Sequence, residues 1–167
     1  MVIDELLKGA PIKILKNEEF LAGAQAILGL ARQRVDICTY KFELSERADA
    51  RDLNSLVKIL FTLASNKILV RVLLNTTGRH SGLTKINENA AKILKKNGLQ
   101  VRCLPDGRCQ HAKAIIVDDE FAMIGSHNWS PRSMTDNMEM SVLIKGAEYL
   151  QNVKATFNKV WEGSKIL

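Results

Sequence analysis

Segments with the periodicity of β-strands alternate with segments of helical periodicity along nearly the whole chain, and this alternation constrains the fold most. Residues 67–74, KILVRVLL, are almost continuously apolar, as in a strand that is covered on both faces. Residues 53–64 instead carry apolar side chains at helical spacing. This order predicts an α/β fold with a mixed, mostly parallel β-sheet flanked by helices on both faces.

The same patterns predict the individual elements. We expect strands at residues 12–15, 35–42, 67–74, 99–104, 112–117, 121–124 and 139–144. We expect helices at residues 20–31, 53–64, 87–96 and 148–161. Asn17 is a candidate N-cap for the first of these helices. Turn-forming residues predict loops at 44–52, 75–82 and 130–136, a turn at 105–107, and a hairpin connection at 118–120.

Length and charge limit the classes of protein to consider. The chain has 167 residues with three prolines and ten glycines, so we expect a single domain over residues 1–167. Its formal net charge of +6 favours anionic partners such as nucleic acid or phosphates. Residues 1–15 lack the layout of a secretory signal, and residues 20–31 are too short an apolar stretch to span a membrane. We therefore expect a cytoplasmic protein.

The cysteines suggest neither a disulfide framework nor a metal site. Their number is odd, and the spacing of Cys38, Cys103 and Cys109 is irregular. Cys103, Cys109 and His111 could be three zinc ligands, but no fourth ligand stands at a usual spacing. We expect no metal and no cofactor.

Residues 111–128, HAKAIIVDDEFAMIGSHN, gather the residue types that phosphate chemistry needs. Side chains two apart on a strand share a face, so His111 and Lys113 should lie side by side. The hairpin should return Gly125, Ser126 and Asn128 beside them, with Gly125 leaving room for a ligand. Lysine, hydroxyl and amide groups can donate hydrogen bonds to phosphate oxygens, and a histidine can act as a nucleophile or as an acid and base.

This stretch resembles the HKD motif of the phospholipase D superfamily, H-x-K-x4-D-x6-G-S-x-N. All six motif positions match without a gap, at His111, Lys113, Asp118, Gly125, Ser126 and Asn128. Asn137 and Glu139 further resemble the family's downstream Asn-x-Glu. The resemblance covers about residues 20–144 and implies a phospholipase D/nuclease-like sandwich.

The resemblance also implies a mechanism. The family forms a phosphohistidine intermediate without a metal and combines two motif copies in one site. This chain has one motif, because neither His80 nor His127 begins another H-x-K. It is similar to the family's small single-motif nucleases, which complete the site across the axis of a homodimer.

Residue roles carry over from the family at the matching positions. His111 would be the nucleophile in one subunit and the acid and base in the other, and Lys113 and Asn128 would bind phosphate with help from Ser126. Glu139 would hydrogen-bond an imidazole nitrogen and hold its orientation. We interpret Asp118 as structural, because it lies next to the turn, where it would hold the hairpin.

Three functions remain open. The first is an endonuclease on DNA or RNA, which the single motif, the small size and the basic charge favour. The second is a phospholipid hydrolase or phosphatidyl transferase, less favoured because aromatic residues make up 5% of the chain and no membrane anchor is evident. The third is a non-catalytic module that binds nucleic acid or phosphate. Arg79 and His80 would either contact a nucleic-acid backbone or belong to a solvated loop.

Overall fold

The computed structural model describes residues 3–45, 50–76, 81–105 and 108–167. The strands are β1 (Ile12–Lys16), β2 (Arg34–Thr39), β3 (Leu69–Leu74), β4 (Gln100–Cys103), β5 (Ala114–Val117), β6 (Phe121–Gly125), β7 (Met140–Lys145) and β8 (Lys165–Ile166). The helices are α1 (Ile3–Leu7), α2 (Glu19–Leu30), α3 (Arg51–Ser65), α4 (Ser81–Lys96), α5 (Pro131–Thr135) and α6 (Ala147–Glu162).

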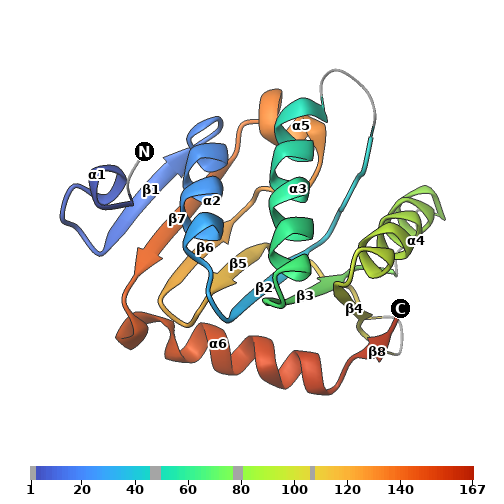
Figure 1. The fold of residues 1–167 in the computed structure, drawn as a ribbon. Coiled ribbons are helices and arrows are strands. Elements are labelled where there is room, and N and C mark those ends of the chain that lie inside the picture. Colours follow the sequence, from blue (N-terminus) through green and yellow to red (C-terminus); the bar gives the residue numbers. More distant parts are fainter. Residues whose placement is uncertain (1–2, 46–49, 77–80, 106–107) are drawn as a thin grey trace.

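These eight strands form one mixed sheet in the order β1-β7-β6-β5-β2-β3-β4-β8 (Figure 1). The prediction of a mostly parallel sheet is wrong. Only the pairs β2–β3 and β3–β4 are parallel, and the other neighbouring pairs in the described chain are antiparallel. One reason is the short connection of residues 118–120 between β5 and β6, which permits only an antiparallel pair because parallel strands need a long crossover.

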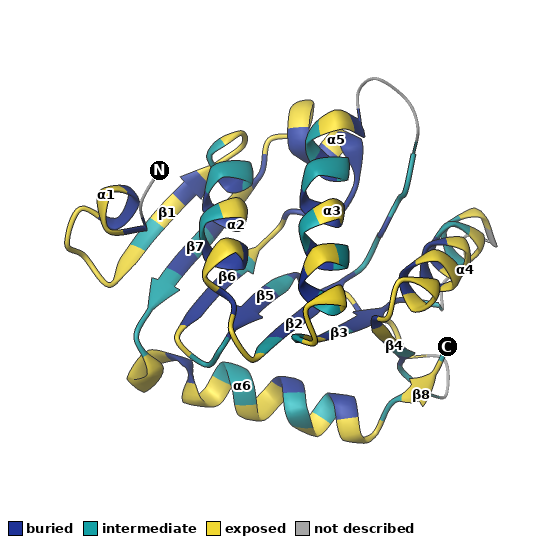
Figure 2. Cartoon of the chain, viewed as in Figure 1, coloured by how far each residue is buried: buried dark blue, intermediate teal, exposed yellow. Residues whose placement is uncertain are grey.

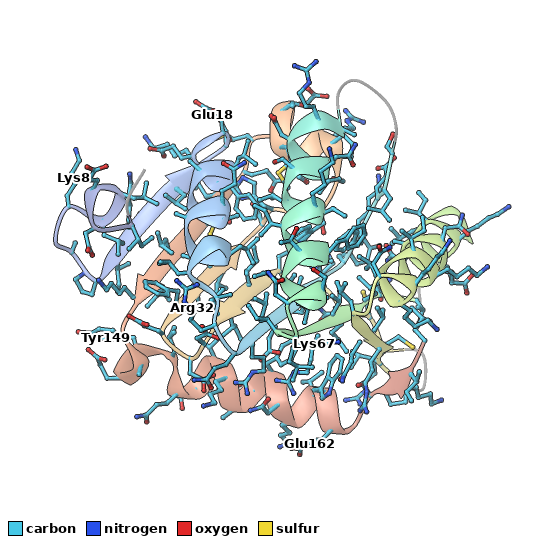
Figure 3. All side chains as sticks on the ribbon, in the orientation of Figure 1. Lys8, Glu18, Arg32, Lys67, Tyr149 and Glu162 are labelled. Carbon is cyan, nitrogen blue, oxygen red and sulfur yellow. The ribbon has the colours of Figure 1, made fainter. Side chains whose placement is uncertain are left out.

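Helices cover both faces of the sheet, as the sequence predicts. α2, α3 and α4 lie on one face, where their apolar side chains form the larger core with β2, β3 and β5 (Figures 1 and 2). Of the described helices, α6 packs on the other face, which we call the α6 face, with Leu150, Phe157 and Trp161 against the strands. It runs across that face from the end near Tyr149 to the end near Glu162 (Figure 3). Trp161 is 6% exposed and belongs to the core on this face.

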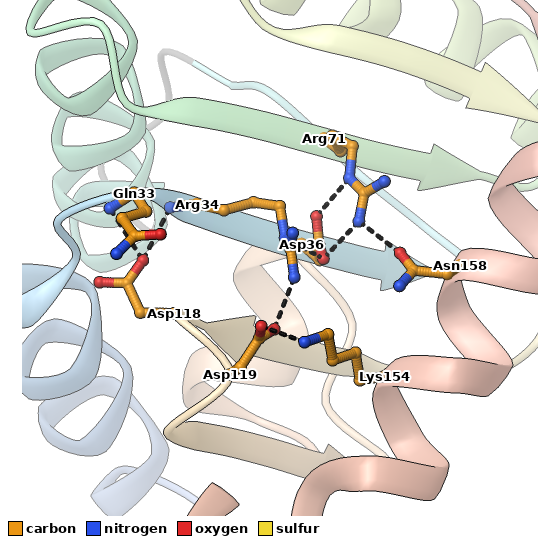
Figure 4. A network of polar contacts seen from close by, with 8 residues as sticks. All are labelled: Gln33, Arg34, Asp36, Arg71, Asp118, Asp119, Lys154 and Asn158. Carbon is orange, nitrogen blue, oxygen red and sulfur yellow. Dashed lines mark hydrogen bonds and ion pairs between the residues drawn. The ribbon is translucent and has the colours of Figure 1, made fainter.

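Two carboxylates, one buried and one partly exposed, link α6 to the sheet. Asp36 on β2 is 1% exposed and accepts two hydrogen bonds from Arg71 on β3, from Nε at 2.6 Å and from Nη2 at 2.7 Å. The same Nη2 donates to Oδ1 of Asn158 on α6 at 2.8 Å. A second ion pair joins Lys154 on α6 to Asp119 after β5 (Figure 4). Arg71 thus connects the buried carboxylate of Asp36 on β2 to Asn158 on α6.

Several local predictions differ from the structure. α4 begins at Ser81, so the predicted loop 75–82 is shorter, and its residues 77–80, including Arg79 and His80, lie outside the described residues. The same holds for residues 106–107 of the predicted turn. α5 forms within the predicted loop 130–136, where Pro131 occupies its first turn. Asn17 does not cap α2, because its Oδ1 accepts the backbone N–H of Glu139 at 2.9 Å.

No helix within the described ranges is both long and apolar enough to cross a membrane.

Candidate active site

The β5–β6 hairpin brings the two halves of the motif together at one end of the sheet. Lys113 directly precedes β5, and Gly125 ends β6. The two residues face each other, with the Gly125 N–H donating to the Lys113 carbonyl oxygen at 3.1 Å. His111 and Lys113 therefore lie beside the segment from Gly125 to Asn128, as the hairpin predicts.

The side chains of His111 and Lys113 are in contact. The Lys113 Nζ lies 3.1 Å from Nδ1 and 3.3 Å from Nε2 of His111, and it donates to the His111 carbonyl oxygen at 2.6 Å. The Tyr40 ring borders both groups: its centroid is 4.7 Å from that of the imidazole and 5.5 Å from Nζ. His111 is exposed whereas Lys113 is buried. The imidazole is thus open to a substrate, with a cation directly behind it.

Burial lowers the pKa of Lys113 from its usual 10.5, and the negative charge of Glu139 opposes this shift. An ammonium group with little water around it gains more from an anionic ligand than an exposed one does. Lys113 is therefore suited to hold a phosphate oxygen next to His111.

Asn128 is oriented by the segment after β2. Its Oδ1 accepts the backbone N–H of Lys41 at 3.1 Å and the hydroxyl of Thr39 at 3.4 Å. Since the oxygen is engaged in this way, the amide presents its NH2 group as a donor. This is the group that a phosphate-binding role for Asn128 requires.

The side chains of Glu139 and Ser126 form a hydrogen bond with each other. Glu139 is 7% exposed and accepts hydrogen bonds from the hydroxyls of Ser126 and Ser133 and from Nδ2 of Asn137. Burial alone would raise the pKa of Glu139, but these three donors bring it below its usual 4.5. Among the described contacts of one chain, Glu139 does not bond the imidazole of His111, the contact that the resemblance implies. The hydroxyl of Ser126, which was expected to help bind phosphate, donates to Glu139.

Asp118 and Gly125 shape the backbone around the motif. Asp118 has a φ of 50° after β5, and its carboxylate accepts the backbone N–H groups of Arg32, Gln33 and Arg34 at 2.5, 2.9 and 2.7 Å. It therefore holds the segment leading into β2 as well as the hairpin (Figure 4). A Cβ at Gly125 would collide with the Met140 carbonyl and with Ser141. Gly125 therefore permits the close approach of β7. From the sequence we expected it to leave room for a ligand instead.

Three buried amides behind the site were not anticipated from the sequence. Asn87 on α4 donates from Nδ2 to the carbonyl oxygens of Tyr40 at 2.8 Å and Asn75 at 2.6 Å. Asn75 accepts the Gln110 N–H at 2.9 Å. This chain of bonds, which we call the amide brace (Asn75, Asn87 and Gln110), links the segment carrying Tyr40 to the residue before His111. The only sequence signal is polar residues next to strand ends, which is too common to be specific.

The imidazole of His127 is buried and is held by neighbouring groups. It is 2% exposed and stacks on Phe20 at 4.1 Å, with Nδ1 2.8 Å from the Ser141 hydroxyl and Nε2 3.2 Å from the Asn17 carbonyl oxygen. Burial lowers its pKa. Trp129 is also buried, stacked on Phe42. Of the histidines that the structure describes, His111 is the exposed one. No group of three His, Cys, Asp or Glu in the described ranges could hold a metal ion.

Comparison with known proteins decides the family. The family model described as "Cardiolipin synthase, PLD-like domain" matches residues 25–161, which is most of the chain. The chain belongs to the phospholipase D superfamily. The match confirms, at the level of the family, the resemblance carried by the six motif positions. Members of this superfamily are phosphodiesterases.

Individual members of the superfamily differ in their named substrates. Human mitochondrial cardiolipin hydrolase is 27% identical over 158 residues, which cover 95% of this chain and 57% of that protein. The mouse 5'-3' exonuclease PLD4 is 26% identical over 141 residues, or 81% of this chain and 28% of that protein. The chain thus spans little more than half the length of the first of these relatives.

The fold of the phospholipase D superfamily is shown by solved structures as well. Nuc from Salmonella typhimurium, a phospholipase D family member, superposes with a TM-score of 0.74 at 18% identity, covering 93% of this chain and 97% of that one. The predicted phospholipase D/nuclease-like sandwich is therefore confirmed.

Proposed function

We propose that this phospholipase D superfamily member is a metal-independent endonuclease that hydrolyses phosphodiester bonds of DNA or RNA in a site shared by two copies of the chain. The observation that carries the proposal is the exposed His111 in contact with buried Lys113. Among the residues that the structure describes, one chain offers one exposed imidazole, that of His111, since His127 is buried. The reaction needs a nucleophile and a separate acid, so a second copy supplies the second His111.

His111 of one copy attacks phosphorus, a P–N bond forms, and the bond from phosphorus to the leaving oxygen breaks. That oxygen takes a proton from the imidazolium of His111 in the other copy. The resulting neutral imidazole then removes a proton from water, which attacks phosphorus and breaks the P–N bond. Lys113 and the NH2 group of Asn128 stabilise the charge on the non-bridging oxygens. Glu139 positions the site through Ser126 and through its charge near Lys113.

Nucleic acid is the favoured substrate because the net charge is +6 and a relative of the chain is named an exonuclease. A phospholipid is the second candidate. The name of the human relative, cardiolipin hydrolase, favours it. A cytoplasmic location stays a prediction from the sequence.

The test is hydrolysis by the purified protein in EDTA, with plasmid DNA, single-stranded DNA, RNA, bis-(p-nitrophenyl) phosphate and cardiolipin vesicles as separate substrates. We expect cleavage of nucleic acid that falls steeply with added salt. His111→Asn should lower kcat by at least ~10³-fold, as loss of a nucleophile does. Lys92→Asn, at an exposed position on α4, is the matched control and should retain activity.

Each alternative has a distinct result. Loss of cleavage in EDTA would refute the metal-free mechanism, and a fully active His111→Asn protein would refute the nucleophile. Cleavage of cardiolipin alone would establish the lipid reading. Binding of nucleic acid without cleavage of any diester would leave the non-catalytic module as the function.

A further inference from the structure

Tyr40, directly after β2, carries a hydroxyl group that none of the described residues binds. Its interactions are the hydrogen bond that its carbonyl oxygen accepts from Asn87 and the contacts of its ring with His111 and Lys113. The Tyr40 side chain is half-buried, and every buried polar side-chain atom in the described ranges has a hydrogen-bond partner. The unbonded hydroxyl is therefore open to solvent.

The backbone on both sides of Tyr40 is fixed to the segment that carries Asn128. The hydroxyl of Thr39 and the N–H of Lys41 both donate to Oδ1 of Asn128. The Lys41 carbonyl oxygen accepts the backbone N–H of Trp129 at 3.0 Å. Tyr40 lies between these two anchors, so its side chain has a defined place beside the amide that would bind phosphate.

The ring of Tyr40 lies against the two groups on which the proposed reaction depends. Its centroid is 4.7 Å from that of the His111 imidazole, with 54° between the planes, and 5.5 Å from the Nζ of Lys113. The imidazole is exposed, so a phosphate that His111 attacks must lie in front of it. The ring borders that place, and the hydroxyl is its one polar group.

The site lacks the hydroxyl donor that the sequence predicted. Ser126 was expected to help bind phosphate, but its hydroxyl donates to Glu139. Lys113 and Asn128 remain as donors in each copy. The two non-bridging oxygens of a phosphodiester gain charge in the transition state, and each has more than one lone pair to accept hydrogen bonds. The free hydroxyl of Tyr40 is suited to supply a further donor.

We propose that Tyr40 is a further catalytic residue, whose hydroxyl donates a hydrogen bond to a non-bridging oxygen of the phosphate that His111 attacks. The inference rests on the proposed function in that His111 holds the reacting phosphate. It applies to a nucleic acid and to a phospholipid alike, because both present the same phosphodiester group. The hydroxyl keeps its proton, and its hydrogen bond strengthens as negative charge develops on the oxygen.

The first test removes the hydroxyl and keeps the ring. Tyr40→Phe should lower kcat for bis-(p-nitrophenyl) phosphate at least about tenfold, as loss of a hydrogen bond to a charged group does. Tyr149→Phe is the matched control, because Tyr149 is the other tyrosine of the chain and is 49% exposed on α6. It should keep the wild-type kcat. Circular dichroism checks that both variants are folded.

The second test asks whether the hydroxyl touches the phosphate. The substrate is an analogue of the same diester in which sulfur, a weak acceptor, replaces both non-bridging oxygens. The ratio of kcat for the oxygen diester to kcat for the sulfur analogue should fall at least about threefold in Tyr40→Phe, because only the oxygen diester loses a strong hydrogen bond. A tyrosine that only held the His111 ring in place would change both rates equally.

A Tyr40→Phe protein with wild-type kcat, or with an unchanged ratio, would overturn the inference and leave the proposed function standing. A wild-type protein that cleaves no diester would refute the proposed function, and the affinity for inorganic phosphate, measured by calorimetry, would then decide the inference. Binding at least about threefold weaker in Tyr40→Phe would support the hydrogen bond. Equal binding by the two proteins, or binding by neither, would overturn it.

Discussion

The Nζ of Lys113 lies within 3.3 Å of both ring nitrogens of His111 and 2.6 Å from its carbonyl oxygen. One cation therefore contacts both the side chain and the backbone of the proposed nucleophile. Because Lys113 is buried and its pKa is lowered, its charge is a titratable part of the site. Substrate binding should depend on this charge.

The activity should fall at high pH as Lys113 loses its proton. Its pKa lies below 10.5, so the loss begins at a lower pH than for an exposed lysine. Lys113→Arg should lower kcat/KM, because arginine has a different shape, but it should remove this alkaline decline. The measurement is kcat/KM from pH 7 to 11 for both proteins. An unchanged alkaline decline in Lys113→Arg would assign it to another group.

Glu139 should stabilise the fold in a pH-dependent way. Its folded pKa is below 4.5, so its contribution is fully present above pH 4.5 and is lost as the pH falls through the lowered value. Glu139→Gln should reduce the free energy of unfolding at pH 7 by about 1–3 kcal/mol, since a charged acceptor of three hydrogen bonds is lost. Urea unfolding at pH 7 and pH 3 tests this. A difference between the two proteins that is as large at pH 3 as at pH 7 would contradict it.

The parts of the fold that depend on local pattern could be predicted from the sequence. The turn at 118–120 fixes the hairpin, and the hairpin then determines that Lys113 meets Gly125. The contact of Gly125 with β7 could not be predicted, because the local sequence pattern does not show which strands pair with each other. Asn17 was misassigned for the same reason: its side chain bonds Glu139, a residue remote in sequence.

The candidate site shows the same division. The positions of His111, Lys113 and Asn128 follow from the motif, whereas the roles of neighbouring groups depend on contacts across the sheet. Tyr40 lies beside His111 because β2 and β5 are neighbours in the sheet. The sequence of neither segment predicts that these two strands pair. Ser126 was expected to contact phosphate, yet its hydroxyl reaches Glu139 on the neighbouring strand.

The amide brace should control the position of His111. Asn87 is 0% exposed, and Asn87→Ala would leave the Tyr40 and Asn75 carbonyls without their donor. We expect a loss of about 2–4 kcal/mol in unfolding free energy and a drop of at least about tenfold in kcat, with little change in KM. Asn97→Ala is the matched control, because Asn97 donates to the Ile93 carbonyl at the exposed end of α4.

The kinetic result decides whether the brace positions the site or only stabilises the fold. Both variants are compared at a temperature where each is fully folded by circular dichroism. An Asn87→Ala protein with wild-type kcat under these conditions would show that the brace contributes stability alone.

The carboxylate of Asp118 should stabilise the start of β2 without taking part in the reaction. Asp118→Ala leaves three backbone N–H groups, those of Arg32, Gln33 and Arg34, without their shared acceptor. It also places alanine in the left-handed region, at a φ of 50°, where alanine is less favourable than aspartate. We expect a loss of about 2–3 kcal/mol. Asp118→Asn keeps one acceptor oxygen and tolerates this φ, so its loss should be smaller. Urea unfolding measures the stability of the wild type and the two variants. The kcat of the folded protein should be the same for all three. A large fall in kcat in Asp118→Asn, with its stability retained, would show that Asp118 takes part in the reaction.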